Sequence, residues 1–288
     1  MDALRDSLSS ALGLGVTELA PLPGGDINRA YRAELADGSR CFVKTNCWEL
    51  LAMFEAEAEA LREIARSDTL RVPSPLAIGS EREHAYLVLG WLSLRRADAL
   101  GAAAFGRGLA AMHAVREARY GWHRDNTLGS APQANAWSDD WVSFWRDRRL
   151  GPQLALAVGN GYGPELAEPG AGLMDALDEI LADHRPPAAL LHGDLWAGNW
   201  GVTTEGAPAL YDPALYYGDP ETDLAMMALF GGFPQACWDA YYARNPPLPG
   251  WERRRQLYQL HHVLNHANLF GGGYLAQAVA IIERLVGW

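Results

Sequence analysis

The chain has 288 residues, of which 49% are hydrophobic and 20% are charged, and its formal net charge is −11. This length supports one large domain or two lobes with a sizeable core. The excess of acid argues against nucleic acid and anionic membranes as partners. No apolar stretch of 18 residues and no secretory signal are found, and the three cysteines cannot pair completely. These features predict a cytoplasmic protein with reduced thiols.

The first third of the chain predicts a small lobe of mixed strands and helices. Residues 2–12 are expected to form a helix, and residues 48–66 form a second one with apolar side chains on one face. The pair Asp37-Gly38 is a hairpin signal between two strands. The expected strands are within residues 22–31, on both sides of a glycine turn, and at residues 40–45, 77–80 and 84–89.

The rest of the chain is expected to be mostly helical. Phe105, Leu109 and Met112 recur at helical spacing in its first part. The sequence therefore predicts an α+β fold with an N-terminal nucleotide-binding lobe (1–89), a linker (90–93) and a larger helical lobe (94–288). Further helices are expected at residues 141–148 and 173–181, and from Asp223, Pro234, Glu252 and Tyr274 onward.

The most informative segment is His192-Gly193-Asp194-Leu195-Trp196-Ala197-Gly198-Asn199. It places Asp194 five residues before Asn199, and Asp212 follows thirteen residues later. Phosphoryl transfer from ATP uses a carboxylate beside the acceptor hydroxyl, followed by an amide and a second carboxylate that bind Mg²⁺. The same order and spacing occur in protein-kinase-like folds. Each residue alone could equally be an ordinary turn residue, but the three together favour catalysis.

A phosphate-binding lysine is also predicted. Lys44 ends the apolar run Cys41-Phe42-Val43, so it points into a cleft if its neighbours face the core. In a kinase such a lysine pairs with a helix glutamate, and Glu57 is our choice among Glu55, Glu57 and Glu59. Without the downstream motif, a surface lysine would be the simpler interpretation. Gly24-Gly25 could bring backbone N–H groups close to phosphate, although a glycine turn alone is a weak signal.

Two other motifs carry less weight. His123-Arg124-Asp125 has the letters of a protein-kinase catalytic loop, but Ser130 stands where an asparagine is needed, so we reject that role. This segment could still line a substrate pocket. His262 and His266 lie one helical turn apart, yet the sequence supplies no further zinc ligands, so polar substrate contacts or core hydrogen bonds are favoured there.

The chain resembles the fructosamine kinase, or ketosamine-3-kinase, family from about residue 23 to residue 274. Glycine-aromatic motifs near the C-terminus are specific to that family and are absent from aminoglycoside and choline kinases. The resemblance is carried by Phe42-Val43-Lys44-Thr45-Asn46, Met53-Phe54-Glu55-Ala56-Glu57, the segment 192–199, Tyr211-Asp212-Pro213-Ala214, Leu229-Phe230-Gly231-Gly232-Phe233-Pro234 and Leu269-Phe270-Gly271-Gly272-Gly273-Tyr274.

The resemblance implies a two-lobed protein-kinase-like fold and an ATP- and Mg²⁺-dependent enzyme. The enzyme would phosphorylate the C3 hydroxyl of a ketosamine, free or protein-bound, and the unstable product would release the amine. By the family pattern, Asp194 is the catalytic base, Asn199 and Asp212 hold the metal, and Lys44 with Glu57 holds phosphate. Gly90, Trp91 and Leu92 fall at the adenine-binding linker, and His192 and Asp223 support the catalytic loop.

The sequence also bears on the assembly state, the adenine contacts and the alternative functions. The glycine loop of many eukaryotic members has a cysteine, near which Asp26 stands here, so a disulfide-linked dimer is not expected and a monomer is favoured. Gly90 stands where relatives often have an acidic residue, which leaves backbone contacts to adenine possible. The alternatives are a kinase for an aminoglycoside or amino sugar, and a non-catalytic pseudokinase. The expected substrate wall is Trp122, His123, Asp125, Trp196, Glu221 and His262.

Overall fold

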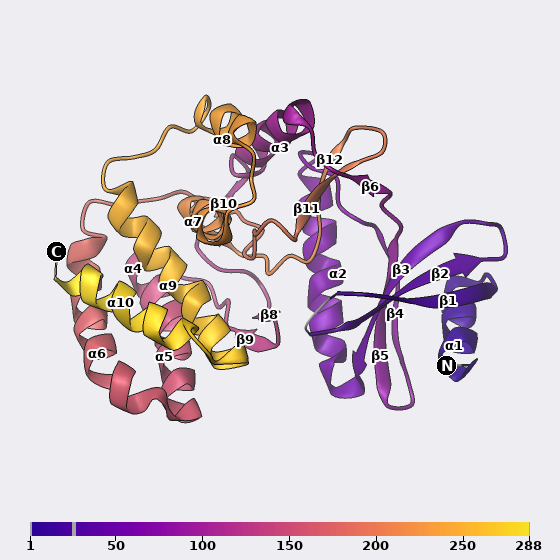
Figure 1. Cartoon of the computed structure of the whole chain (residues 1–288), viewed down its shortest axis with the longest axis horizontal. Helices are drawn as coiled ribbons and strands as arrows, with labels where there is room; N and C mark the ends of the chain where they lie inside the picture. The colour runs from indigo at the N-terminus through magenta and orange to yellow at the C-terminus, as the bar shows by residue number, and fades with distance from the viewer. Residues whose placement is uncertain (1, 25–26, 288) are drawn as a thin grey trace.

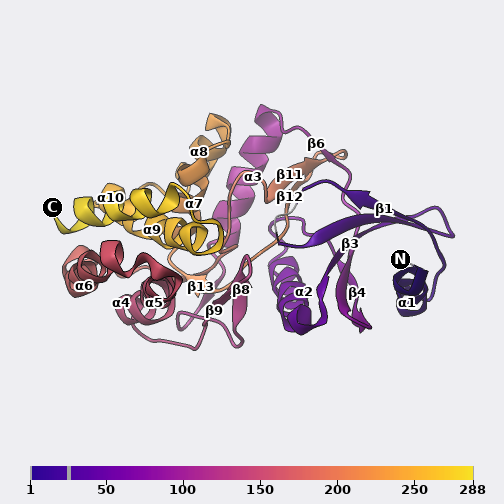
Figure 2. The same cartoon turned by 60° about the horizontal axis from the view of Figure 1, so that its bottom comes forward.

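The computed structural model describes residues 2–24 and 27–287 and has a lobe built on one sheet beside a lobe built mainly of helices (Figure 1). The helix α2 stands between the sheet and the helical lobe in both views (Figures 1 and 2). The α+β architecture expected from the sequence is therefore confirmed. Every helix in the described part of the chain is too short or too polar to cross a membrane.

The sheet of the first lobe is antiparallel throughout and has the strand order β1-β2-β3-β5-β4. In β3, Val43 pairs with Val88, and Lys44 pairs with Leu87. Because side chains alternate along a strand, Lys44 and Val43 point to opposite faces. The strands are β1 (Val16–Leu22), β2 (Arg29–Leu35), β3 (Arg40–Cys47), β4 (Pro75–Glu81) and β5 (His84–Gly90).

The two faces of this sheet pack against different helices. On one face, Leu4 and Leu8 of α1 (Asp2–Leu12) join a core that includes Val43 and Val88. On the other face, α2 (Leu51–Arg66) packs Phe54 against strand residues such as Leu87. A single 3₁₀ turn, residues 48–50, leads into α2. Lys44 therefore lies on the face that α2 covers.

The chain passes into the second lobe after β5. Residues 91–93 follow Gly90, and β6 (Leu94–Arg95) then pairs with β11 (Trp200–Thr203), which also pairs with β12 (Pro208–Leu210). A second small sheet has the order β13 (Tyr217–Gly218), β10 and β7. These short strands hold the residues 191–199 between β10 and β11, and the residues 211–216 between β12 and β13. The remaining strands are β7 (Arg116–Glu117), β10 (Ala188–Leu190) and the hairpin of β8 (Asn126–Leu128) with β9 (Ala131–Gln133).

The helices of the second lobe enclose one large apolar core. Aromatic side chains such as Phe105, Trp141 and Trp145 are fully buried in it. The helix α9 runs through the lobe and buries Leu257, Leu260 and many neighbours. The helices are α3 (Ala99–Met112), α4 (Trp141–Trp145), α5 (Gly151–Ala157), α6 (Gly163–Ile180), α7 (Glu221–Phe230), α8 (Gln235–Tyr242), α9 (Trp251–Phe270) and α10 (Tyr274–Val286).

The expected helices are present, with differences at their ends and joints. Helix α7 begins at Glu221 rather than Asp223, because Pro220 is the last residue before the helix and fits an N-terminal position. Two π-helical turns, residues 146–150 and 158–162, join α4, α5 and α6 in a way that apolar spacing did not predict. Helix α9 ends at a glycine, since Gly271 has φ 66° and its N–H donates to the Ala267 carbonyl at 2.9 Å.

Candidate active site

A lysine joins two carboxylates where the lobes meet. The sheet register turns Lys44 towards α2, and its Nζ lies 2.7 Å from Glu57 Oε1 and 2.6 Å from Asp212 Oδ1. Burial opposes the charge of this ammonium, but the two carboxylates outweigh that cost and hold the pKa of Lys44 above its usual value. Lys44 is therefore a charged ammonium at neutral pH, and it links the sheet, α2 and the second lobe.

The catalytic loop, residues 191–199, is held by a buried carboxylate. Asp223 Oδ2 accepts the His192 backbone N–H at 2.8 Å, and Oδ1 accepts the Gly193 N–H at 2.9 Å. His113 Nε2 lies 3.2 Å from the same carboxylate. Because these donors bind the ionised form, they keep the pKa of Asp223 below its usual value although burial acts in the opposite direction. Asp223 thus fixes the loop backbone immediately before Asp194.

His192 joins the catalytic loop to the metal loop, which we define as residues 211–216. Its Nε2 donates to the Tyr211 carbonyl at 2.9 Å, and its backbone carbonyl accepts the Ala214 N–H at 2.9 Å. Its Nδ1 accepts the Asp194 N–H at 3.2 Å, so the ring is the neutral Nε2–H tautomer. Burial agrees with this, because it lowers the pKa of His192. The two loops therefore form one hydrogen-bonded unit.

Gly193 sets how closely these two loops approach. Its φ is +83°, a left-handed conformation that side chains rarely adopt. A Cβ at this position would lie 2.1 Å from the Ala214 carbonyl oxygen. A glycine is therefore required between His192 and Asp194.

Asp194 lies partly buried beside Asn199. Asn199 Nδ2 donates to the Asp194 backbone carbonyl at 2.9 Å and to Asp194 Oδ2 at 3.3 Å. Burial raises the pKa of Asp194 to about 7, and the nearby charges of Asp212 and Asp223 act in the same direction. A carboxylate with a pKa near the working pH suits general base catalysis.

Asp212 has an uncommon backbone conformation. Its φ is +59°, which is uncommon for a residue other than glycine. The side chain is 46% exposed, and while Oδ1 contacts Lys44, the carboxylate faces the cavity between the lobes. Asp212 is thus held in place by its loop rather than by burial of its side chain.

The cavity between the lobes has a volume of about 550 Å³. Asp194, Asn199, Asp212 and Lys44 all line it, and Glu57 does so beside Lys44. Its other walls come from the glycine-turn region, β2, β3, the tip of the β8–β9 hairpin, α7 and α9. They include Gly24, Ile27, Asn28, Phe42, Trp196 and Phe270.

Several predicted nucleotide and substrate residues lie elsewhere. Gly25 is outside the described residues, as is Asp26. Gly90 ends β5 and donates its N–H to the Ser74 carbonyl at 2.8 Å. Neither Gly90 nor the half-buried Trp91 and Leu92 is among the cavity-lining residues, so an adenine contact there stays a prediction.

Of the six residues expected in the substrate wall, Trp196 alone lines the cavity among the described residues, and it is 41% exposed. Trp122 is buried in the core, and His123 Nε2 lies 2.6 Å from Glu59 of α2. Asp125 Oδ1 accepts the Asn135 backbone N–H at 2.7 Å.

The other two, Glu221 and His262, have buried surroundings. Burial lowers the pKa of His262 to about 3, so this imidazole is neutral. Glu221 is held by the Arg254 guanidinium, with Nε to Oε2 at 2.6 Å and Nη2 to Oε1 at 2.7 Å. Direct substrate contacts by these buried side chains stay a prediction, and their observed partners are protein groups.

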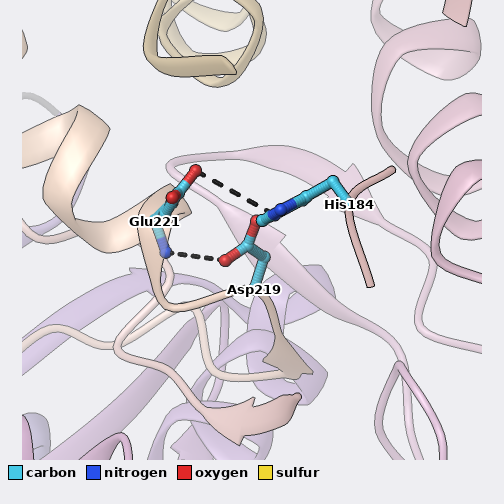
Figure 3. A group of neighbouring side chains, drawn as sticks. All are labelled: His184, Asp219 and Glu221. Carbon is cyan, nitrogen blue, oxygen red and sulfur yellow. Dashed lines mark hydrogen bonds and ion pairs between the residues drawn. The ribbon is translucent and has the colours of Figure 1, made fainter. Parts of the chain in front are cut away.

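Glu221 belongs to a group of possible metal ligands in the described part of the chain, together with His184 and Asp219 (Figure 3). His184 Nε2 lies 2.5 Å from Asp219 Oδ2, which also accepts the Tyr258 hydroxyl at 2.6 Å. The Glu221 N–H donates to Asp219 Oδ1 at 2.9 Å. Because Arg254 already neutralises Glu221 and protein donors use the oxygens, we interpret this group as a structural ion-pair network.

Sequence reasoning missed the part of the cavity wall formed by β8 and the turn after it. These residues, Asn126 to Gly129, follow directly after the rejected His123-Arg124-Asp125 motif. His266 lies on α9 with Nδ1 2.8 Å from the His262 carbonyl, and its ring is near Phe230, Phe270 and Tyr274. The glycine-aromatic motifs were the available signal, because they contain Phe230, Phe270 and Tyr274.

The oxygen atoms at this site fit a magnesium ion. Asn199 donates through Nδ2, which leaves its amide oxygen available, and Asp212 supplies a half-exposed carboxylate in the same cavity. Amide and carboxylate oxygens are hard ligands of the kind that Mg²⁺ prefers. Lys44 lines the same cavity beside Asp212, so phosphate oxygens would find positive charge there.

The comparisons with known proteins agree with this arrangement. A family model described as "Fructosamine kinase" matches residues 2–287. The chain belongs to the fructosamine kinase family. It is 44% identical over 274 residues to a "Probable ketoamine kinase" of Synechocystis sp., which covers 93% of this chain and 90% of the relative. It is 37% identical over 273 residues to "Protein-ribulosamine 3-kinase, chloroplastic" of Oryza sativa subsp. japonica, covering 93% of this chain and 78% of that one.

Solved structures confirm the family's fold over the whole length. The structure described as "putative fructosamine-3-kinase" from Thermobifida fusca is 31% identical to this chain and has a TM-score of 0.87. The match covers 100% of both chains. An ADP-bound aminoglycoside phosphotransferase has a TM-score of 0.66 at 14% identity, which shows a shared fold only. The kinase-like fold predicted from the resemblance is confirmed.

Proposed function

We propose that this member of the fructosamine kinase family uses Mg-ATP to phosphorylate the C3 hydroxyl of ketosamines. The observation that carries the proposal is the convergence of Asp194, Asn199, Asp212 and Lys44 on one cavity. These are the groups that phosphoryl transfer requires, and they come from loops and strands far apart in the sequence. The family and the relatives named above supply the substrate class.

Asp194 is the general base of this proposal. Its carboxylate is partly buried, has a pKa of about 7, and is positioned by Asn199 and by the loop backbone that Asp223 holds. It would orient the sugar hydroxyl and accept its proton as the phosphoryl group arrives. Trp196, two residues further and half-exposed in the same cavity, offers a flat face to the substrate.

Lys44 and the metal ligands would neutralise the transferred group. Mg-ATP supplies the phosphoryl group and the divalent charge that stabilises it during transfer. Asn199 and Asp212 would hold the metal through their oxygens, and Lys44, oriented by Glu57, would bind phosphate oxygens. The cleft thus orients the nucleotide from the sheet lobe and the sugar from the helical lobe. The phosphorylated ketosamine would then break down and release its amine.

The proposal is tested by following ADP release from ATP with a panel of free and protein-bound ketosamines of different sugar lengths. We expect turnover with at least one ketosamine, and a 3-phosphate on the sugar by NMR. Aminoglycosides and simple amino sugars belong in the same panel, because the fold is shared with aminoglycoside phosphotransferases.

The Asp194→Ala variant is the matched control for this assay. It should bind ATP but lose turnover by about 10²–10⁴-fold, the usual contribution of a general base. Near-normal phosphorylation by this variant would contradict the role of Asp194. Turnover with aminoglycosides alone would move the assignment to that class, and no ATP consumption with any acceptor would favour a pseudokinase.

A further inference from the structure

The segment His123-Arg124-Asp125, which resembles a catalytic motif but is not one, makes contacts that the proposed reaction does not explain. It lies immediately before the β8–β9 hairpin, and β8 packs beside α2 (Figure 2). Helix α2 carries Glu57, the partner of Lys44. The segment therefore stands between a helix that orients the phosphate-binding lysine and the lobe that contains the catalytic loop.

Ion pairs attach this segment to α2. Arg124 Nη1 lies 2.9 Å from Glu59 Oε2, and His123 Nε2 lies 2.6 Å from Glu59 Oε1. Arg124 Nη2 also lies 3.7 Å from Glu55 Oε2. The Arg124 and Glu59 side chains are 29% and 35% exposed, so solvent screens the pair only in part. Two donors therefore hold Glu59, which lies two residues after Glu57 on the same helix.

A network of buried amides continues from this segment into the hairpin. Asn135 donates its backbone N–H to Asp125 Oδ1 at 2.7 Å, and its Nδ2 to the Arg124 carbonyl at 3.2 Å and to Asn126 Oδ1 at 2.9 Å. Gln133 Nε2 donates to Asn126 Oδ1 at 2.9 Å. Asn126, Gln133 and Asn135 are all buried, so the backbone after Arg124 has little freedom to move.

The same amides hold the metal loop. Asn126 Nδ2 donates to the Leu215 carbonyl at 2.8 Å, and Gln133 Nε2 donates to the Ala214 carbonyl at 3.1 Å. Ala214 and Leu215 follow Asp212 in the metal loop by two and three residues. The hairpin thus fixes the backbone that positions Asp212, while Arg124 fixes the helix that positions Glu57.

We propose that Arg124 is a positioning residue, which locks α2 to the metal loop through the β8–β9 hairpin and so keeps Glu57, Lys44 and Asp212 in one arrangement. The arrangement is tight, since Lys44 Nζ is within 2.7 Å of both carboxylates. A small rotation of α2 would separate Glu57 from Lys44. Positioning of this kind matters because misplacement by about 1 Å can cost about 100-fold in rate. The role of Arg124 rests on the proposed kinase activity.

A second contact between the lobes limits how far α2 can move. Tyr217 Oη donates to Glu63 Oε1 at 2.8 Å, two turns further along α2 than Glu55. Loss of Arg124 should therefore loosen the end of α2 that carries Glu55 and Glu57 without detaching the helix. This predicts an effect on catalysis larger than the effect on folding.

The test compares Arg124→Ala with Arg62→Ala, a matched variant that removes one cation from the exposed surface of α2. We expect kcat of Arg124→Ala to fall about tenfold or more, with a smaller change in the KM for ketosamine, while Arg62→Ala behaves like wild type. The melting temperature of Arg124→Ala should stay within a few degrees of wild type, because partly exposed ion pairs contribute about 1 kcal/mol or less.

A charge-exchanged pair, Glu59→Arg with Arg124→Glu, keeps the proposal testable if the single variant folds poorly. We expect each single reversal to lower kcat and the pair to recover at least part of it, with a coupling measurable by a double-mutant cycle. Wild-type kcat in Arg124→Ala would overturn the proposal, as would recovery of stability without kcat in the exchanged pair. Absence of wild-type activity on every ketosamine would instead overturn the proposed function, because the comparison needs an active parent.

Discussion

Two clusters of opposite charges in this protein are alike in composition but differ in accessibility. The active cluster consists of Lys44, Glu57, Asp194 and Asp212, and it opens onto the cavity between the lobes. The buried cluster consists of His184, Asp219, Glu221 and Arg254, and it lies inside the helical lobe. Each brings carboxylates within hydrogen-bonding distance of a cation.

The difference lies in which oxygen atoms remain available. In the buried cluster, Arg254 donates hydrogen bonds to both oxygens of Glu221. Asp219 accepts from His184, Tyr258 and a backbone N–H. In the active cluster, Asp212 is half-exposed beside its single lysine contact. A complete set of protein donors indicates a structural role, whereas carboxylate oxygens that face a cavity indicate a binding site.

The largest expected effect is the loss of stability when the buried cluster loses its arginine. Arg254→Ala should lower the free energy of unfolding by about 3–5 kcal/mol, because it leaves the Glu221 carboxylate buried without its partner. Chemical denaturation followed by circular dichroism measures this. Arg255→Ala is the control, since Arg255 pairs with Glu252 on the exposed side of the same helix. Equal losses in the two variants would contradict the structural role.

In the active cluster, by contrast, removing a carboxylate should raise the free energy of unfolding, because the buried charge of Asp194 destabilises the folded state. Asp194 has a folded pKa of about 7, above the ordinary aspartate pKa of 3.8, so the folded state binds more protons between these values. Its contribution to stability is therefore lost as the pH rises from about 4 to 7. Asp194→Asn should be more stable than wild type at pH 8, by at most about 4 kcal/mol, and equal to it near pH 4.

Denaturation across this pH range measures the difference. Asp37→Asn is the control of opposite sign, because hydrogen bonds from Ser39 lower the pKa of Asp37. That variant should be less stable than wild type at pH values above the ordinary aspartate pKa, and the difference should disappear as the pH falls below it. A stability gain for Asp194→Asn that does not change with pH would show that charge at Asp194 is not its cause.

The smallest expected effect is the stabilisation by Mg-ATP, which should depend on the active cluster and not on the buried one. Mg-ATP at about 100 times its Kd should stabilise wild type by about 2.7 kcal/mol, measured as a shift in thermal unfolding. Asp212→Ala should lose most of this shift, because it removes a proposed metal ligand. Asp219→Asn should lower the starting stability but keep the shift. A full shift in Asp212→Ala would contradict the proposed metal site, and EDTA should abolish the metal-dependent part in wild type.

The spacing of residues in the sequence was sufficient to predict phosphoryl transfer, but it did not predict which residues line the cavity. Asp194, Asn199 and Asp212 lie within nineteen residues of one another in sequence, so their order alone indicated phosphoryl transfer. Lys44 followed from strand alternation, and family membership confirmed the fold. Tertiary packing decides the cavity wall, because Asn126 of β8 and His266 of α9 line the same cavity although they lie far apart in sequence.

Charge patterns were the least informative signal. Glu221 was expected at the substrate wall, yet it pairs with Arg254, thirty-three residues later in sequence. Arg254 belongs to Arg253-Arg254-Arg255, which has the composition of an exposed helix face, but Arg254 is buried. A single sequence does not show which member of such a run turns inward. The π-helical turns that shape the joints of α4, α5 and α6 were equally invisible to apolar spacing.

The close approach of the catalytic loop to the metal loop depends on the absence of a side chain at Gly193. A Cβ there would lie 2.1 Å from the Ala214 carbonyl oxygen, which also accepts from Gln133 of the hairpin. Any side chain at position 193 would therefore push the two loops apart and disturb the contact of Ala214 with the hairpin. Gly193 thus sets the spacing between two loops of the second lobe.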